Sequence, residues 1–197
     1  MTQFTLNFSK EKVSFNNDTV LYFPNFFDRS YLDTLSTELE WRSDKIQMFG
    51  NIYPLPRLQC WYGDEGIHYS YSGISITRNE WTLPLEEILS KIHDEFPHRF
   101  NGMLGNYYRG GDDQVSWHSD DEESLGSEPA IACASFGETR IFSLRNKETK
   151  ESFQIRLEDR SLLLMLHPTQ RDWEHQINKS KSLKGPRISL TFRFVHQ

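Results

Sequence analysis

The sequence predicts a mainly β fold of the α+β class, a sandwich or barrel, with two helices that precede most of its strands. From about residue 103 onwards, short stretches rich in β-branched and aromatic residues alternate with turns, and this density of strands is typical of sandwiches and barrels. Two apolar stripes at helical spacing come before these strands. The 197 residues contain no repeat, low-complexity tract or linker, so we expect one domain over residues 1–197.

Two helices are expected, and their apolar stripes are interpreted as core packing. The first helix spans residues 26–41, where Asp28 can cap the N-terminus. Its apolar positions are Tyr31, Leu32, Leu35 and Leu39. The second helix spans residues 83–96, where Pro84 suits the first turn. Its apolar stripe consists of Leu85, Ile88, Leu89, Ile92 and Phe96.

Eight strands are expected in the second half of the chain. They span residues 103–109, 114–118, 130–136, 139–146, 152–157, 160–166, 172–177 and 187–195. Between the two predicted helices, residues 48–73 combine glycine, proline and many aromatic residues. We expect irregular hairpins in that segment.

The charge balance argues mildly against a nucleic-acid partner. The formal net charge is −6, and phosphate binding depends on lysine and arginine. The charges are segregated, however, because the acidic residues crowd into 112–123. The basic cluster near the C-terminus consists of Lys179, Lys181, Lys184 and Arg187. A local basic edge therefore remains open.

Several features favour a cytoplasmic protein, or a nuclear one if the source is eukaryotic, with no membrane partner. The longest apolar run, 162–166, is far too short to span a bilayer. The first residues, MTQFTLNFSKEK, lack the basic start and apolar stretch of a secretory signal. Cys60 and Cys133 have apolar or aromatic neighbours in the sequence, which predicts buried thiols in a reducing compartment.

The segment VSWHSDDEE at 115–123 suggests a metal site. If the strand continues to Asp120, His118 and Asp120 lie on one face, because side chains two positions apart share a face. In DWEHQI, His175 alternates with glutamate and glutamine and shares its face with Trp173 and Ile177, so it can face the same cavity. Two histidines and one carboxylate that leave coordination positions open are characteristic of non-haem Fe(II) oxygenases.

This interpretation has simpler alternatives. The pattern His-x-Asp occurs often by chance, so a solvated acidic loop remains open. A single histidine on the inner face of a strand is commonly only a core residue.

The segment GPRISLTFRFV carries two arginines on one face of a predicted strand. That face consists of Arg187, Ser189, Thr191 and Arg193, and the opposite face is apolar. Buried guanidiniums need anionic partners, because an unpaired buried charge is costly. A small dicarboxylate would satisfy both arginines through charge-assisted hydrogen bonds, and two structural salt bridges to Asp or Glu are the alternative.

Taken together, these segments resemble the AlkB family of Fe(II)- and 2-oxoglutarate-dependent dioxygenases, in particular the branch that removes alkyl groups from nucleic-acid bases. The resemblance runs from about residue 46 to the end. It is carried by MFGNIYPLPRLQCWYGDEG, YSYSG, GNYYRGGDDQVSWHSDDE, IACASFGETRIF, TQRDWEHQI and PRISLTFR. It implies a double-stranded β-helix, or jelly roll, supported by N-terminal helices and hairpins. Residues 46–73 would form nucleotide-recognition hairpins and 103–197 the catalytic core.

The resemblance also implies the binding residues of the catalytic core. The iron ligands would be His118, Asp120 and His175. The residues that bind the co-substrate 2-oxoglutarate would be Asn106, Tyr108, Arg187, Thr191 and Arg193. The third reactant would be O2.

The substrate side is implied in the same way. Tyr71 and His118 would hold a flipped base between them, and Tyr69 and Asp121 would hydrogen-bond it, with Glu122 close by. Phe49, flanked by Gly50 and Asn51, is the candidate wedge that fills the gap left by the extruded base; a hairpin packed on its own domain is the alternative. Candidate phosphate contacts are Arg57, Lys179, Lys181 and Lys184.

The implied activity is oxidative demethylation of N-alkylated bases, such as 1-methyladenine and 3-methylcytosine, in DNA. It would be coupled to decarboxylation of 2-oxoglutarate and would release formaldehyde from a chain expected to act as a monomer. RNA and DNA substrates are not separable from the sequence. The alternatives are an oxygenase of the same fold acting on RNA, protein or a small molecule, and a non-catalytic nucleic-acid-binding module.

Overall fold

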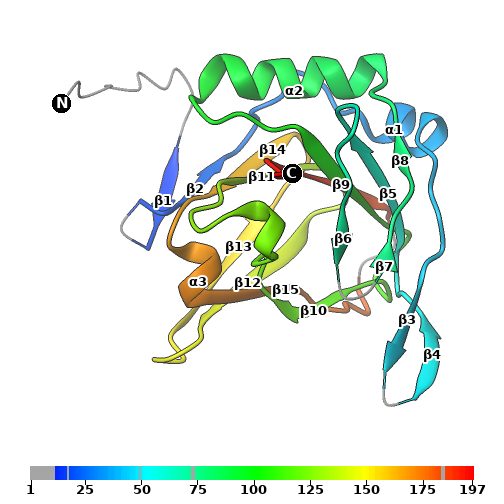
Figure 1. Cartoon of the computed structure of the whole chain (residues 1–197). Helices are drawn as coiled ribbons and strands as arrows, with labels where there is room; N and C mark the ends of the chain where they lie inside the picture. Colours follow the sequence, from blue (N-terminus) through cyan, green and yellow to red (C-terminus); the bar gives the residue numbers. More distant parts are fainter. Residues whose placement is uncertain (1–11, 17, 49, 72–73, 183–184) are drawn as a thin grey trace.

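Two β-sheets facing each other form the body of the protein (Figure 1). The computed structural model describes residues 12–16, 18–48, 50–71, 74–182 and 185–197. The large sheet has eight strands in the order β1 (Val13–Phe15), β2 (Val20–Phe23), β14 (Ser161–Met165), β11 (Ile131–Gly137), β16 (Arg187–Arg193), β9 (Gly102–Tyr108), β5 (Leu58–Gly63) and β8 (Arg78–Asn79). The small sheet has the order β10 (Val115–His118), β15 (Trp173–Ile177), β12 (Arg140–Asn146) and β13 (Ser152–Leu157).

The chain from β9 to β16 follows the path of a jelly roll. Strands β9, β11, β14 and β16 lie side by side in the large sheet, and strands β10, β12, β13 and β15 form the small one. All pairings among these strands are antiparallel. The eight strands expected from the sequence are therefore confirmed, with bounds that differ by no more than two residues. The expected double-stranded β-helix is also confirmed.

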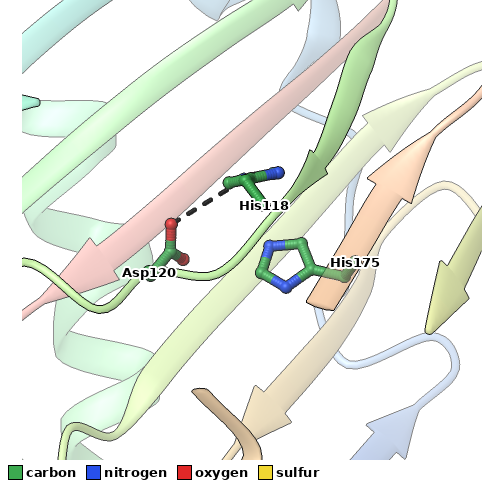
Figure 2. Close-up of side chains that lie close together, drawn as sticks. All are labelled: His118, Asp120 and His175. Carbon is green, nitrogen blue, oxygen red and sulfur yellow. Dashed lines mark ion pairs between the residues drawn. The ribbon is translucent and has the colours of Figure 1, made fainter. Parts of the chain in front are cut away.

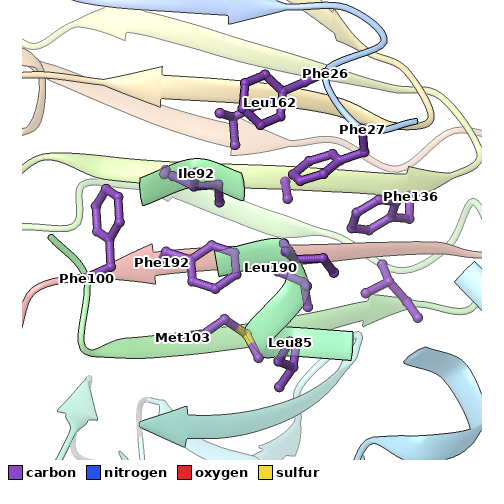
Figure 3. Packing of buried hydrophobic residues seen from close by; sticks show 14 of the residues in the cluster. Phe26, Phe27, Leu85, Ile92, Phe100, Met103, Phe136, Leu162, Leu190 and Phe192 are labelled. Atoms are coloured by element: carbon purple, nitrogen blue, oxygen red, sulfur yellow. The ribbon is translucent and has the colours of Figure 1, made fainter. Parts of the chain in front are cut away.

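A layer of helices covers the outer face of the large sheet. Helix α2 (Leu83–Glu95) begins with a proline in its first turn, as expected, and places Leu85, Ile88 and Ile92 fully out of contact with solvent. Figure 3 shows this core, in which residues of α2 meet apolar side chains of the large sheet such as Leu190 and Phe192. Burial of this stripe fixes the helix against the sheet, because each buried aliphatic or aromatic side chain contributes about 1.5–3 kcal/mol.

The first predicted helix is wrong at both ends. Helix α1 spans only Leu32–Glu38, and Tyr31 occupies its N-cap position without a side-chain cap. Asp28 lies outside the helix and forms an ion pair with Lys91 of α2 at 3.1 Å. The reason is upstream packing: Phe26 and Phe27 are each 1% exposed, and they enter the core before the helix begins.

The expectation of irregular hairpins over 48–73 is wrong for Leu58–Gly63. That segment is strand β5, which pairs with β9 in the large sheet and is buried from Gln59 onwards. Its alternating pattern sends Cys60 and Tyr62 to the helix side of the sheet and Trp61 to the other side. The segment is therefore a buried strand and not a surface hairpin.

Two short hairpins lie beside the body. Strands β3 (Lys45–Met48) and β4 (Asn51–Pro54) form one, which projects away from the sheets at the lower right of Figure 1. Strands β6 (Ser70–Tyr71) and β7 (Ile74–Ser75) form the other. A one-turn 3-10 helix, Glu123–Leu125, and a short helix α3, Thr169–Asp172, follow β10 and β14 respectively.

The two thiols have the state predicted for them. Cys60 and Cys133 are both buried and form no disulfide. No helix within the described ranges is both long and apolar enough to cross a membrane.

We predict that Gly102→Ala destabilises the fold. A Cβ at this position would clash with the ring of Trp61, which is fully buried in the core. The free energy of unfolding should fall by about 1–3 kcal/mol in urea titrations, the usual cost of overpacking.

Gly185→Ala is the matched control. The nearest atom to its Cβ, at 2.8 Å, would be the terminal Oε2 of the flexible Glu138 side chain, and the other contacts are with the same side chain at 3.4 Å or more. Its unfolding free energy should change by less than about 0.5 kcal/mol. Equal stabilities of the two variants would contradict the proposed contact between Gly102 and Trp61.

Candidate metal centre and its cavity

Three side chains that could hold a metal ion converge between the two sheets. The ligand atoms of His118, Asp120 and His175 all lie within 4.8 Å of one another (Figure 2). Nε2 of His118 is 3.9 Å from Oδ1 of Asp120. The two imidazoles come from adjacent strands, where His118 and His175 are register partners with ring centroids 4.3 Å apart.

The carboxylate reaches this place by a route other than the predicted one. Strand β10 ends at His118, so Asp120 lies in the loop beyond it rather than on the same strand. The side-chain oxygen of Gln170 accepts a hydrogen bond from the backbone N–H of Asp120 at 2.9 Å. The hydroxyl of Ser119 donates to the carbonyl of Trp173 at 2.9 Å. These two hydrogen bonds fix the loop against α3 and β15.

A buried ion pair keeps the carboxylate charged. Asp120 is 3% exposed, and Nη2 of Arg193 donates to its Oδ1 at 2.8 Å. Burial by itself raises the pKa of Asp120, but the charges of Arg193 and of the two histidines outweigh burial and lower this pKa to about 2. Asp120 is therefore an anion at neutral pH, which is the form that binds metals.

Both imidazoles are suited to metal binding. Nδ1 of His118 lies 2.8 Å from the carbonyl oxygen of Ser116, so it can donate its proton there and leave Nε2 as the free lone pair. Burial and the neighbouring His118 lower the pKa of His175 to about 3, despite the opposing effect of Asp120. His175 is thus neutral at physiological pH, and its ring is stacked on Phe142.

The triad faces a cavity of about 540 Å³. The polar face of β16, consisting of Arg187, Ser189, Thr191 and Arg193, lines this cavity as the alternation of the strand predicted. Asn106 and Tyr108, from the neighbouring strand β9, line it too. The sequence placed these side chains on one cavity, and the structure brings them together.

Arg187 is a buried cation without an anionic partner in the described parts of the chain. It is 1% exposed, and only its Nη2 has a hydrogen-bond acceptor, the hydroxyl of Ser135 at 2.9 Å. Its Nε and Nη1 have none within those parts. Its guanidinium lies 5.2 Å from the centroid of the Tyr108 ring, a cation–π contact. A buried charge in this state calls for an anionic ligand.

The donor set fits a ferrous ion and a dicarboxylate. Two neutral imidazoles and one carboxylate on one side of a cavity leave coordination positions open, which is the arrangement of non-haem Fe(II) sites. The unsatisfied guanidinium of Arg187 in the same cavity matches a carboxylate of the size of 2-oxoglutarate. The alternative of two structural salt bridges applies to Arg193 only, which pairs with Asp120.

Comparison with known proteins agrees with this geometry. The sequence model of the 2OG-Fe(II) oxygenase superfamily matches residues 19–193. The mouse protein named alpha-ketoglutarate-dependent dioxygenase alkB homolog 3 is 39% identical over 191 residues, which cover 90% of this chain and 66% of that protein. Mouse DNA oxidative demethylase ALKBH2 is 34% identical over 184 residues, covering 86% of this chain and 77% of that one.

The chain belongs to the AlkB family of the 2OG-Fe(II) oxygenase superfamily. It spans about two thirds of the length of its alkB homolog 3 relatives. Solved structures share its fold: OsALKBH1 superposes with a TM-score of 0.65 at 14% identity over 93% of this chain and 100% of that chain. A 2OG-Fe(II) oxygenase family oxidoreductase from Burkholderia pseudomallei gives 0.58 at 12% identity, over 89% and 84% respectively.

The AlkB-family cavity is lined by Arg57, to which the sequence assigned another role. Arg57 was a candidate phosphate contact, but it is 6% exposed and donates from Nε to Oδ1 of Asn106 at 2.7 Å. Gln59 donates to the same oxygen at 2.9 Å. The expectation for Arg57 is therefore wrong, and the residue instead fixes the side chain of Asn106 on the cavity wall.

Of the residues expected to hydrogen-bond the base or to lie close by in this AlkB chain, two line the cavity and one does not. Tyr69 is buried, stacks on Trp61 and donates its hydroxyl to Oε1 of Glu122 at 2.9 Å. Both Tyr69 and Glu122 line the cavity. Asp121 does not line it, because its side chain is 64% exposed and lies 3.5 Å from Lys147. The structure thus directs Glu122, rather than Asp121, towards the ligand space.

Most of the remaining candidates belong to the two hairpins. Phe49 and the side chain of Tyr71 lie outside the described residues, as does Lys184. Gly50 and Asn51 are exposed at the tip of the β3–β4 hairpin and do not line the cavity. The sequence analysis did not identify Gln170. Its contact with the backbone of Asp120 joins two segments that lie far apart in the chain, and no local sequence pattern indicates such a contact.

We predict that Asp120→Asn weakens metal binding by more than about 100-fold, because substitutions of residues that only support metal ligands already cost about 10–100-fold. Isothermal titration with Mn²⁺, a redox-stable stand-in for Fe²⁺, measures this. Glu123→Gln makes the same change in charge at an exposed position, the first residue of the 3-10 helix that follows the loop, and should leave the affinity unchanged. Equal affinities of the two variants would remove Asp120 from the metal site.

Proposed function

We propose that this AlkB-family chain is an Fe(II)- and 2-oxoglutarate-dependent dioxygenase that oxidatively removes methyl groups from nitrogen atoms of DNA bases, such as those of 1-methyladenine and 3-methylcytosine, and releases formaldehyde. One observation carries this proposal: a two-histidine, one-carboxylate cluster shares its cavity with a buried arginine that lacks an anionic partner among the described residues. The names of the relatives, a dioxygenase and a DNA oxidative demethylase, support the same activity.

In this proposal His118, Asp120 and His175 hold the iron. Arg193 holds Asp120 in its ionised form and in position, through the hydrogen bond of 2.8 Å. Gln170 fixes the backbone of the same residue. These two contacts hold the Asp120 carboxylate in position beside the two imidazoles, which would favour metal binding.

The co-substrate would lie along the polar face of β16. Arg187 would pair with one carboxylate of 2-oxoglutarate through its unsatisfied Nε and Nη1. Asn106, Tyr108, Thr191 and Arg193 line the same space and would complete its hydrogen bonds. Arg57 supports this wall by fixing Asn106.

When bound, iron, 2-oxoglutarate and O2 supply the oxidising chemistry that converts 2-oxoglutarate to succinate and CO2 and hydroxylates the methyl carbon of the substrate. The protein positions the reactants and limits the access of water. The apolar side chains of Leu104, Phe142 and Met165 exclude water from one side of the cavity. The hydroxymethyl group on the base nitrogen then separates as formaldehyde. No protein nucleophile takes part.

Glu122 is the proposed reader of the base. One of its carboxylate oxygens accepts from Tyr69, and the other, Oε2, is buried without a partner within the described residues. A buried acceptor in this state favours a ligand that donates a hydrogen bond. The exocyclic amino groups of 1-methyladenine and 3-methylcytosine are such donors, and both bases are positively charged, which suits a carboxylate.

The β3–β4 hairpin is the proposed nucleotide-recognition element, together with residues up to 73. Ile52 and Tyr53 are 68% and 49% exposed on this projecting hairpin, and Tyr53 also lines the cavity. Exposed apolar side chains beside a cavity are suited to contact a splayed nucleotide. We propose Phe49, which lies between β3 and β4 in the sequence, as the wedge, and Tyr71 as the partner of His118 in stacking on the base.

The proposal extends to a monomeric enzyme in the cytoplasm, or in the nucleus of a eukaryote. The net negative charge of the chain bears on which form of nucleic acid it would bind. A net charge of −6 lowers affinity for duplex phosphates, which favours single strands with an accessible base.

We predict formaldehyde release from a single-stranded DNA oligonucleotide containing 1-methyladenine or 3-methylcytosine, in the presence of Fe(II), 2-oxoglutarate and O2. Glu123→Gln should match the unaltered chain, and Asp120→Asn should lose at least about 100-fold in rate, because it removes a metal ligand. A matching RNA oligonucleotide and a protein extract, assayed in parallel, separate the alternatives. Succinate formation without formaldehyde from any nucleic acid would favour a small-molecule or protein substrate instead.

We also predict that Glu122→Gln lowers kcat/KM for the methylated oligonucleotide by about 10–100-fold. The loss of one charged hydrogen bond in a dry cavity is worth about 1.5–3 kcal/mol. Uncoupled decarboxylation of 2-oxoglutarate should continue, because Glu122 is not part of the co-substrate site. A larger loss in Asp121→Asn than in Glu122→Gln would restore the assignment made from the sequence.

A further inference from the structure

The two cysteines lie on opposite faces of the large sheet. Cys60 is fully buried in the core between the sheet and the helices, with Leu85 and Ile88. Cys133 belongs to the cluster between the two sheets and lines the cavity of about 540 Å³. Of the two thiols, only that of Cys133 therefore faces this cavity.

Polar groups of β16 surround this thiol. Sγ of Cys133 lies 3.1 Å from the hydroxyl oxygen of Ser189. Cys133 is the register partner of Thr191 on the neighbouring strand. Both of these residues belong to the face of β16 that also carries Arg187 and Arg193. The thiol is thus part of the wall that we assign to the co-substrate.

Two buried guanidiniums make this wall selective for anions. Arg187 and Arg193 are 1% and 3% exposed, and Nε and Nη1 of each have no hydrogen-bond partner within the described residues. Asp120 neutralises Arg193, while Arg187 has no anionic partner in those residues. A small carboxylate that enters the cavity would be attracted to Arg187 and held on the wall that carries Cys133.

We propose that Cys133 is a covalent modification site for small carboxylates that carry an electrophilic carbon. The thiolate is the nucleophile, and its proton leaves to water. With a haloacetate, sulfur forms a bond to the methylene carbon while the carbon–halogen bond breaks, and the halide leaves with the bonding pair. The product is a thioether, and the step requires no oxidant or reductant.

The modification would block the cavity. The added carboxymethyl group would occupy the space beside Ser189 and Thr191 and would place a permanent carboxylate near Arg187. The free carboxylate of 2-oxoglutarate would then compete with a tethered one. The inference rests on the proposed co-substrate site, because Cys133 lines the same cavity as Arg187, and it adds a modification site to that wall.

The test compares two reagents of similar size on the full chain. Iodoacetate carries a carboxylate and iodoacetamide is its neutral counterpart, and peptide mass spectrometry gives the alkylation rate of each cysteine. The ratio of the iodoacetate rate to the iodoacetamide rate should be at least about tenfold higher for Cys133 in the folded chain than for the same residue in guanidinium, because one hydrogen bond to a charged group is worth about 1.5–3 kcal/mol.

Two controls are built into the chain and the cavity. Cys60 should remain unmodified by both reagents while the chain is folded, because it is fully buried on the far face of the sheet. 2-Oxoglutarate should slow the alkylation of Cys133 by iodoacetate in proportion to its own occupancy of the cavity. Alkylated protein should no longer bind 2-oxoglutarate in equilibrium dialysis, a measurement that involves no turnover.

Several outcomes would overturn the proposal. These are an equal reagent ratio in the folded and unfolded chain, a Cys133 rate unaffected by 2-oxoglutarate, and alkylation of Cys60 at the rate of Cys133. Arg187→Gln should bring the ratio down to its unfolded value, with folding checked by circular dichroism. If that variant does not fold, the competition by 2-oxoglutarate on the unaltered chain decides. Equilibrium dialysis of the unalkylated chain shows separately whether 2-oxoglutarate binds, so failure of the modification site is distinct from failure of the proposed function.

Discussion

The buried ion pair between Arg193 and Asp120 is the interaction on which the site depends. Its 2.8 Å hydrogen bond joins the last strand of the large sheet to the loop that follows β10 in the small sheet. Either charge alone would be costly in this interior, and breaking such a pair by removing one partner costs about 3–5 kcal/mol. The pair therefore links closure of the jelly roll to the presence of an ionised carboxylate beside two imidazoles.

The alternation of strand β16 makes this link compatible with a large core. Ile188, Leu190 and Phe192 point to the helix layer and are fully buried there. The residues between them point to the cavity between the sheets. One strand thus contributes both to the apolar core and to the polar wall of the cavity, because successive side chains of a strand face opposite ways.

The cavity contains two polar side chains with unsatisfied atoms, and each favours a different kind of ligand. Arg187 presents donors without an acceptor, and Glu122 presents an acceptor without a donor, in the described part of the chain. Both line the same cavity, yet they do not pair with each other. A single small anion could satisfy Arg187 but would be repelled by Glu122. An anionic co-substrate together with a cationic, hydrogen-bond-donating base satisfies both, which is why the proposed reaction uses the whole cavity.

The sequence alone determined the eight strands of the jelly roll, helix α2 and the faces of β15 and β16, because each depends on a local period of two or about 3.6 residues. It also indicated the metal-binding residues and the two arginines, through residue types and a resemblance carried by several ordered segments. Tertiary structure alone decided the rest. Phe26 and Phe27 pack in the core, so helix α1 begins later than predicted. Leu58–Gly63 pairs with β9 and is therefore a buried strand. Gln170 and Arg193 placed Asp120, and the bend of the chain after His118 turned Glu122 inward and Asp121 outward. These choices depend on contacts between segments far apart in the chain, and no local pattern of residues encodes such contacts.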